Sequence, residues 1–194
     1  MNIYIFGLGA IGSNVLIQLI RKYPNIHFIG IDYDIVEERN IATQVYMQGM
    51  VGIPKASAII SAIASKLYNF KYSPVIKRVE TGDDVENILS ANRDTSLILD
   101  CFDNSHSRKI LYKLRENTLH IGFSPKYSAE ILWNENYSVP GDIPDDLNDI
   151  CIMTEAIPFI NLVASLACFI ISEFIDENIK RNILITNKYV VRVL

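Results

Sequence analysis

A glycine-rich turn placed directly after a short apolar strand is the feature that most constrains the fold of this chain. Residues 2–6 (NIYIF) form a β-branched and aromatic run, and the turn Gly7-x-Gly9-x-x-Gly12 follows at once. Over residues 15–20 the apolar spacing becomes helical. This order predicts a βαβ nucleotide-binding unit, in which Gly7 permits a tight turn, Gly9 leaves room for a phosphate and Gly12 lets the helix pack closely on the strand.

A carboxylate follows the second predicted strand. Residues 27–31 form that strand and end in Asp32, which lies about 20 residues beyond Gly12, the distance at which a carboxylate reaches a ribose hydroxyl. The helix that follows the glycine turn presents free N–H groups and a positive dipole end to an anion. The alternative is a plain βαβ unit whose glycines serve packing alone.

Strands and helices alternate as far as residue 123. The further elements that we predict in this part are strands at 75–79, 96–100 and 119–123 and helices at 55–68, 84–90 and 104–116. Such alternation is typical of an α/β protein, here a Rossmann-like, doubly wound and mainly parallel sheet with right-handed crossovers. We therefore expect residues 1–123 to form a nucleotide-binding core.

The pattern changes in residues 124–194. We expect an added strand at 126–133, a long polar connection at 134–150 that is typical of a lid, an apolar helix, and two C-terminal strands joined around residues 186–188. With 194 residues and 49% hydrophobic content, the chain is long enough to bury one sizeable core. We predict that residues 1–194 form a single domain.

The apolar helix is the segment most easily mistaken for a membrane span. Residues 156–172 (AIPFINLVASLACFIIS) carry no charge and are bracketed by Glu155 and Glu173. The run is shorter than the roughly 20 residues that a spanning helix needs. Small residues near its centre allow another helix to approach closely. We predict a buried or subunit-interface helix and a homodimer, because an uncharged helix of this length must be covered.

Charge and cysteine content exclude several classes of partner. A net charge of −4, without a cluster of Lys and Arg, argues against nucleic acid or a membrane surface as the main partner. Cys101, Cys151 and Cys168 lie far apart, which predicts neither a disulfide framework nor a zinc site. The chain enters a strand at once, so we expect no signal peptide and a cytoplasmic location.

Two charged residues near the second strand add to the predicted site. Asp34 follows Asp32 by two residues, and a nicotinamide-cofactor enzyme has no general need for it; the alternative is a solvated loop carboxylate. Lys55 begins a predicted helix, where a cation opposes the helix dipole. A contact with phosphate oxygens explains this lysine better than an exposed position at a helix start.

Asp103 extends the predicted site to the end of the fourth strand. In a doubly wound sheet, ligands bind beyond the carboxyl ends of the strands, so Asp103 points to the same crevice as the glycine turn. A carboxylate there is a candidate Mg²⁺ ligand, because hard cations take carboxylate and phosphate oxygens. The alternative is that Asp103 or Asn104 caps the following helix.

Together these motifs resemble the ThiF/MoeB family, the ubiquitin-activating-enzyme-like adenylyltransferases. The resemblance is carried by GLGAIGS, DYDIVEERNIATQ, GIPKA and DCFDNSHSR, in the family's order and at similar spacings, over about residues 2–123. It implies binding of ATP and Mg²⁺ and adenylation of a carboxylate with release of pyrophosphate. Lys55 and Asp103 are the residues to which the resemblance gives catalytic roles.

The resemblance also assigns positions around the nucleotide. By position, Asp32 holds the ribose, the amides of Gly7, Gly9 and Gly12 and the Lys55 amine hold the phosphates, and Asp103 binds Mg²⁺. The residues that line the triphosphate side by the same comparison are Asp34, Asn40 and Gln44. Cations and oriented N–H donors suit this reaction because negative charges approach one another in it.

Three departures from the family pattern bear on function. Thr43 stands where the family usually has a phosphate-binding arginine. The family's N-terminal helix, which donates an arginine across the dimer, is not expected here, and Arg39 is a candidate to replace that arginine. The zinc-binding cysteine pairs are absent. Cys151 lies near the place where some members have a catalytic or sulfur-transferring cysteine; it is otherwise a small core residue.

These departures leave several functions open. The favoured one is adenylation of a small-molecule carboxylic acid in cofactor biosynthesis, and a compact relative acts in assembly of the iron-guanylylpyridinol hydrogenase cofactor. The C-terminal glycine of a ubiquitin-like or sulfur-carrier protein is the alternative substrate. An NAD-binding oxidoreductase fits the glycine turn and Asp32 equally well but leaves Asp34, Lys55 and Asp103 unexplained. A scaffold subunit without activity is a third class.

Overall fold

The computed structural model describes residues 1–89, 96–114, 117–124, 127–141, 154–186 and 191–193. Its centre is one eight-stranded sheet with the order β3-β2-β1-β4-β5-β6-β7-β8. The strands are β1 (Asn2–Phe6), β2 (His27–Ile31), β3 (Lys71–Val75), β4 (Ser96–Asp100), β5 (Thr118–Ser124), β6 (Ser128–Trp133), β7 (Ile183–Ile185) and β8 (Val191–Val193). The described helices are α1 (Ala10–Lys22), α2 (Lys55–Ala64), α3 (Gly82–Leu89), α4 (Ser105–Leu114) and α5 (Ile157–Glu177), with 3-10 turns at Glu38–Asn40, Gln48–Met50, Asn134–Asn136 and Thr154–Ala156.

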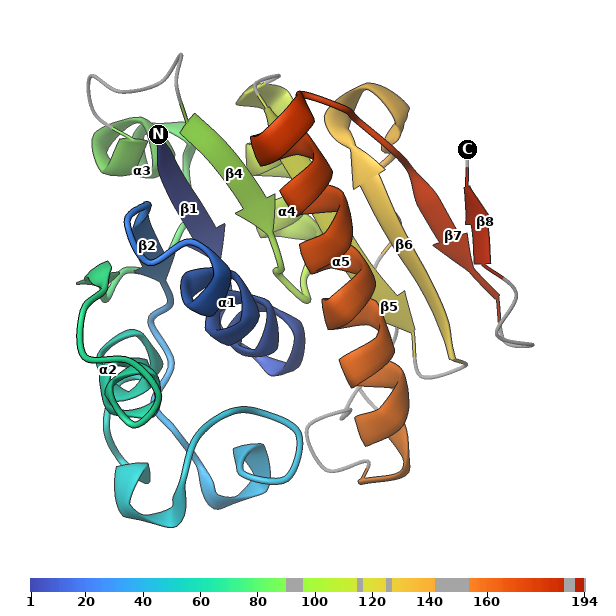
Figure 1. Ribbon diagram of the computed structural model, residues 1–194. Coiled ribbons are helices and arrows are strands. Elements are labelled where there is room, and N and C mark those ends of the chain that lie inside the picture. Colours follow the sequence, from blue (N-terminus) through green and yellow to red (C-terminus); the bar gives the residue numbers. More distant parts are fainter. Residues whose placement is uncertain (90–95, 115–116, 125–126, 142–153, 187–190, 194) are drawn as a thin grey trace.

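The sheet changes character after β5. Strands β1 to β5 pair in parallel, whereas β6, β7 and β8 pair antiparallel. A mainly parallel, Rossmann-like α/β sheet with added C-terminal strands was predicted, and it is confirmed. Figure 1 shows α1 and α5 side by side over one face of the sheet, with α4 behind it.

Both faces of the parallel part are buried, because β1 contributes to two cores. Ile3 and Ile5 pack with residues of α1, α2 and α5, whereas Tyr4 and Phe6 pack with residues of α3 and α4. Side chains alternate between the faces of a strand, so a strand that is apolar on both faces, as Ile3 to Phe6 are, fits a sheet with helices on both sides. The uninterrupted run NIYIF therefore accounts for the central place of β1.

The strand order locates a crevice at one edge of the sheet. Strand β1 lies between β2 and β4, so the chain leaves β1 toward one side first and returns to the other side later. At such a switch point the carboxyl ends of three neighbouring strands open onto a common space. The glycine turn, Asp32 and Asp103 follow β1, β2 and β4, and all three therefore lie at this edge.

Two elements of the predicted nucleotide-binding core have other bounds than predicted. The strand predicted at 75–79 is β3 at Lys71–Val75, which contains Pro74. Proline is unsuited to a central strand, but β3 lies at the edge of the sheet, where one missing N–H donor costs little. The helix predicted at 55–68 ends at Ala64, and the hydroxyl of Ser65 then donates to the carbonyl of Ala62 at 2.7 Å.

The apolar helix is longer than predicted. By length and composition alone, the helical segment Thr154–Glu177 is able to cross a membrane, but half of its most apolar window is buried inside the protein. Helix α5 packs on α1 and on the sheet, as Figure 1 shows. This packing is that of a core helix, which is one of the two roles that we predicted for it.

Candidate functional site

The three glycines of the turn meet different surroundings. Gly7 has a φ of +88°, and a Cβ there would lie 2.8 Å from the carbonyl oxygen of Cys101. A Cβ at Gly12 would overlap the carbonyl oxygen of Gly7, whereas a Cβ at Gly9 would meet nothing within 4 Å. Gly7 and Gly12 are thus required by the packing of the turn itself. Gly9, which precedes the first residue of α1, faces open space where an anion can approach the backbone.

Asp32 ties the end of β2 to the glycine turn. One carboxylate oxygen accepts the N–H of Leu8 at 2.7 Å and the other accepts the N–H of Asp34 at 2.8 Å. Burial raises the pKa of the Asp32 carboxyl, and the nearby charge of Lys55 opposes this shift. A carboxylate oxygen can accept more than one hydrogen bond, so Asp32 retains capacity for a ribose hydroxyl.

Lys55 and Asp34 form an ion pair beside Asp32. The Lys55 amine lies 3.1 Å from the Asp34 carboxylate, and the Lys55 side chain is 8% exposed against 47% for Asp34. The Lys55 N–H also donates to the Asp34 carbonyl at 2.8 Å. Lys55 is therefore not the exposed helix-start lysine that was the alternative reading. Its amine is held at the edge of the crevice by Asp34, which is accessible to solvent.

Asn40 and Gln44 lie in the segment between β2 and α2, and both are buried. The Asn40 side-chain oxygen accepts the N–H of Glu37 at 2.8 Å, and the Asn40 carbonyl accepts the N–H of Gln44 at 2.9 Å. The Asn40 side chain is therefore engaged in capping its own 3-10 turn. Thr43, at the position of the expected family arginine, is buried too, and its carbonyl accepts a hydrogen bond from the Asn14 side chain at 3.1 Å.

Asp103 is exposed at the start of α4. The capping role belongs to its neighbour, because the side-chain oxygen of Asn104 accepts the N–H of Ser107 at 2.8 Å. Asp103 forms no ion pair with any residue in the described part of the chain, which also holds no group of three or more His, Cys, Asp or Glu side chains able to bind a metal. The Asn104 amide donates to the Asp103 carboxylate at 3.5 Å. An accessible carboxylate fits Mg²⁺, which usually takes one or two carboxylates and completes its shell with phosphate oxygens and water.

Buried charges hold the turn that carries Asp103. The Asp100 carboxylate accepts the N–H of Phe102 at 3.1 Å, and the Arg108 guanidinium donates to the Phe102 carbonyl at 2.7 Å. His120 lies 2.7 Å from the other Asp100 oxygen. Both polar groups of the Phe102 backbone are therefore fixed by side chains directly before Asp103. We missed this network in the sequence, where the only indication was an acid at a strand end with an arginine on the next helix.

Two further residues at this edge, Tyr33 and Arg78, were also missed. Tyr33 follows Asp32 and is half exposed, and the Arg78 guanidinium lies over its ring, 5.3 Å from the ring centre. Tyr33 belongs to no motif, and Arg78 comes from the segment after β3, so nothing in the sequence connects the two residues. Cys151, by contrast, lies outside the described residues.

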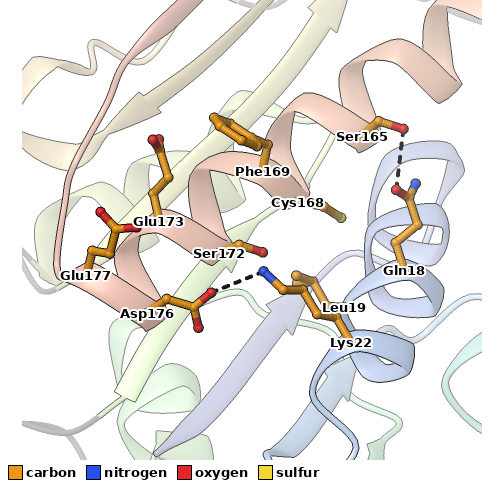
Figure 2. A pocket seen from close by; sticks show the side chains of 10 residues that line it. All are labelled: Gln18, Leu19, Lys22, Ser165, Cys168, Phe169, Ser172, Glu173, Asp176 and Glu177. Carbon is orange, nitrogen blue, oxygen red and sulfur yellow. Dashed lines mark hydrogen bonds and ion pairs between the residues drawn. The ribbon is translucent and has the colours of Figure 1, made fainter.

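A separate cavity of about 440 Å³ lies between α1 and α5 (Figure 2). Lys22 and Asp176, an ion pair at 3.1 Å, line one end of it, and Phe169 and Cys168 line the α5 side. Lys22 is about 18 Å along α1 from the glycine turn, given the rise of a helix, so this cavity is distinct from the crevice. Burial raises the pKa of the Cys168 thiol to about 12, which keeps it protonated.

Comparison with solved structures finds proteins with the same fold. A structure of E. coli MccB with MccA-N7isoASN has a TM-score of 0.75 at 17% identity, and one of E. coli MccB with ATP has 0.73 at 17%. A structure of PaaA has 0.73 at 17%. The matches cover 100% of this chain but only 64%, 63% and 63% of those chains, so this chain spans less than two thirds of their length.

Comparison with protein families finds a match over most of the chain. The model of the ThiF family matches residues 1–119, which contain every residue of the candidate site. A comparison with curated proteins finds no match.

Proposed function

This chain belongs to the ThiF family, and from that membership we propose that it is an ATP-dependent adenylyltransferase that activates a carboxylate. One observation carries the proposal: the open face of Gly9, the Asp32 carboxylate and the Lys55 amine lie at a single crevice. The backbone at Gly9 suits the phosphates of a nucleotide, the Asp32 carboxylate suits its ribose, and the Lys55 amine suits its negative charge. Structures of MccB, a protein of the same fold, are described with ATP and with MccA, which supports this choice.

The proposed reaction is attack of a carboxylate oxygen on the α-phosphorus of ATP. A bond forms between them, the bond from the α-phosphorus to the bridging oxygen breaks, and pyrophosphate leaves. The N–H groups at the start of α1 and the Lys55 amine stabilise negative charge on the phosphates, and Asp32 orients the ribose. Asp103 would hold Mg²⁺, which would supply positive charge against the repulsion between the two reactants. No protein nucleophile is needed for this step.

Nucleotide binding brings a second anion to the Lys55 amine, which already has a partner. In the structure the Asp34 carboxylate holds that amine at 3.1 Å. A phosphate oxygen that approaches Gly9 competes with Asp34 for the same charge. Asp34 is half exposed and is then free to turn toward solvent or a phosphate-bound cation. This exchange gives Asp34 a role on the triphosphate side.

We propose a small carboxylic acid of cofactor biosynthesis as the substrate, the guanylylpyridinol precursor of the iron-guanylylpyridinol cofactor being one candidate. The C-terminal glycine of a ubiquitin-like or sulfur-carrier protein is the alternative substrate. We further propose a cytoplasmic homodimer without zinc, with the outward face of α5 as its contact.

Calorimetric titration tests the nucleotide first. We expect ATP with Mg²⁺ to bind and NAD to bind weakly or not at all. Tight NAD binding without ATP binding would overturn the proposal in favour of an oxidoreductase. Isotope exchange between pyrophosphate and ATP, measured with each class of carboxylate, then identifies the acyl substrate.

A variant of the predicted metal ligand tests the chemistry. Asp103→Ala is expected to lower the exchange rate at least about a hundredfold and to leave the melting temperature unchanged, because Asp103 is exposed and Asn104 caps the helix. Asp83→Ala, which removes an exposed acid from α3, is the matched control and should keep full activity. Equal rates for the two variants would show that Asp103 has no part in the reaction.

A further inference from the structure

His120 is a buried histidine of β5 on the side of the sheet that α4 covers. Its neighbours along the strand, Leu119 and Ile121, pack in the core on the side of α5, so the His120 side chain points to the opposite face. Asp100, the last residue of β4, is its partner in the register of the two parallel strands. Both side chains are 0% exposed. An acid and a base therefore lie side by side in the core, at the strand end that leads to Asp103.

Both ring nitrogens of His120 face oxygen atoms. Nδ1 lies 2.7 Å from a carboxylate oxygen of Asp100, and Nε2 lies 2.8 Å from the side-chain oxygen of Asn134. A third group fixes the orientation of the Asn134 amide, because the amide nitrogen donates to the Tyr112 carbonyl at 3.3 Å and a carbonyl only accepts. The ring thus meets a hydrogen-bond acceptor at each nitrogen. These surroundings favour the doubly protonated ring, the imidazolium.

Other charges around the ring compensate such a cation. The Arg108 guanidinium lies 3.8 Å from the Asp100 oxygen that His120 contacts. The Tyr137 ring stacks on His120 with 3.8 Å between the ring centres, and its hydroxyl lies 3.2 Å from Arg108. Burial raises the pKa of the partly buried Glu130 carboxyl, and the charges of Arg108 and His120 oppose this shift. Asp100 and Glu130 therefore balance two cations that would be costly to bury without partners.

We infer that His120 is a positioning residue for the proposed reaction: as an imidazolium it holds the Asp100 carboxylate in the orientation that fixes the loop before Asp103. With one oxygen bound by His120, Asp100 turns the other to the Phe102 N–H at 3.1 Å. Groups behind a metal ligand orient that ligand, and their loss weakens metal binding. The inference rests on the proposed function, because it gives His120 an indirect role in Mg²⁺ binding by Asp103 at the same site.

Nitrogen-15 NMR of the histidine side chains measures the protonation of His120 directly, with neither nucleotide nor metal present. The chain contains three histidines, so His27→Gln and His106→Gln assign the three rings. We expect both nitrogens of His120 to be protonated at neutral pH. Asn134→Leu, which removes the acceptor at Nε2, should leave one of them unprotonated. A wild-type His120 with an unprotonated nitrogen at neutral pH overturns the inference.

Calorimetric titration with ATP, in the presence and in the absence of Mg²⁺, tests the positioning role. We expect His120→Gln to weaken ATP binding about tenfold or more in the presence of Mg²⁺ and to leave binding without Mg²⁺ unchanged, because the change acts through Asp103. Asn134→Leu should act in the same direction, and it serves as the test if His120→Gln does not fold. His27→Gln is the matched control and should bind as the wild type does, because His27 begins β2, at the opposite end from the crevice, and contacts the Ser73 hydroxyl at 2.9 Å.

The outcomes distinguish this inference from the function on which it rests. If His120→Gln lowers the melting temperature but keeps the full effect of Mg²⁺ on ATP binding, His120 only stabilises the fold; the inference is wrong and the adenylyltransferase stands. Equal weakening of ATP binding with and without Mg²⁺ also overturns it. If the effect of Mg²⁺ falls but the wild type catalyses no pyrophosphate exchange, the positioning role stands and the proposed reaction fails. A wild type that binds no ATP overturns both.

Discussion

The two glycines at the ends of the sequence G-A-I-G have opposite physical reasons. Gly12 is needed because a side chain there would overlap the carbonyl of Gly7, so the constraint is internal to the fold. Gly9 faces open space, so the constraint on it comes from what binds. An alanine substitution at Gly12 therefore tests folding, and one at Gly9 tests ligand binding.

We expect Gly12→Ala to lower the free energy of unfolding by about 2 kcal/mol or more, because backbone atoms must shift to admit the Cβ. Gly9→Ala should change stability by less than about 1 kcal/mol and weaken ATP binding by at least about tenfold, because its Cβ occupies the approach to the first amides of α1. Urea denaturation and calorimetry measure the two effects. A Gly9→Ala protein that binds ATP normally would contradict the phosphate role of the turn.

At the level of residues, the sequence predicted what lies along one strand-turn-helix unit. The steric roles of Gly7, Gly9 and Gly12 and the position of Asp32 follow from spacing alone, because a local motif fixes its own geometry. Arg78 and Arg108 did not follow, since each acts on a residue from another strand or turn. Contacts between elements depend on register, which the spacing of one motif does not encode.

Among the elements, α5 shows how a helix of this length ends. Asn178 follows its last residue in the left-handed conformation, with φ 57° and ψ 33°. Its N–H donates to the Phe174 carbonyl at 3.0 Å, and the N–H of Ile179 donates to the Glu173 carbonyl at 3.3 Å. Such a pair of bonds satisfies carbonyls that the helix itself leaves free, provided that the residue between tolerates a positive φ.

Asn178→Ala is expected to lower the free energy of unfolding by about 1 kcal/mol, because alanine has a Cβ but lacks the short polar side chain that lets asparagine adopt the left-handed conformation. Asn178→Gly should be neutral or slightly stabilising, because glycine has no Cβ. Glu177→Ala, one residue earlier and still helical, serves as the control. Chemical denaturation of the three variants measures the differences. Equal stability of the alanine and glycine variants would contradict this account of the helix end.

Elements were predicted well where hydrophobic runs are long and poorly where they are short. Strand β4 was predicted at its observed bounds because its apolar run Leu97–Leu99 is bounded by a polar residue at each end, Ser96 and Asp100. Strand β3 was misplaced because KYSPV is polar and contains a proline, and only its position at the edge of the sheet makes it a strand. An edge position is a property of the whole sheet, so no window of sequence reveals it.

For the whole molecule, the outward face of α5 bears on assembly. Phe169 is 58% exposed at the cavity between α1 and α5, and Ser165, one turn before it, is exposed too and donates to the Gln18 side chain of α1 at 3.3 Å. Leu162 and Leu166 are partly buried. A small residue next to a large exposed aromatic ring allows another helix to pack against it. This surface supports the homodimer that we propose.

Sedimentation velocity at micromolar concentration measures the assembly. We expect a dimer for the wild type and a monomer for Phe169→Asp, because a charge at the centre of an apolar contact must be desolvated without a partner. Tyr68→Asp places the same charge at an exposed site far along the chain and should remain a dimer. A monomeric wild type, or a Phe169→Asp protein that still sediments as a dimer, would refute this arrangement.

The contact between Lys55 and Asp34 affects which anions bind at this edge of the sheet. A positive charge without a partner at this edge would attract sulfate, orthophosphate and many metabolites alike. Since Asp34 already neutralises it, an entering anion must compensate the carboxylate that it displaces. A polyphosphate that arrives with its own divalent counter-ion offers Asp34 a new partner, whereas a simple oxyanion does not. The protein thereby selects a ligand by its bound counter-ion as well as by its shape.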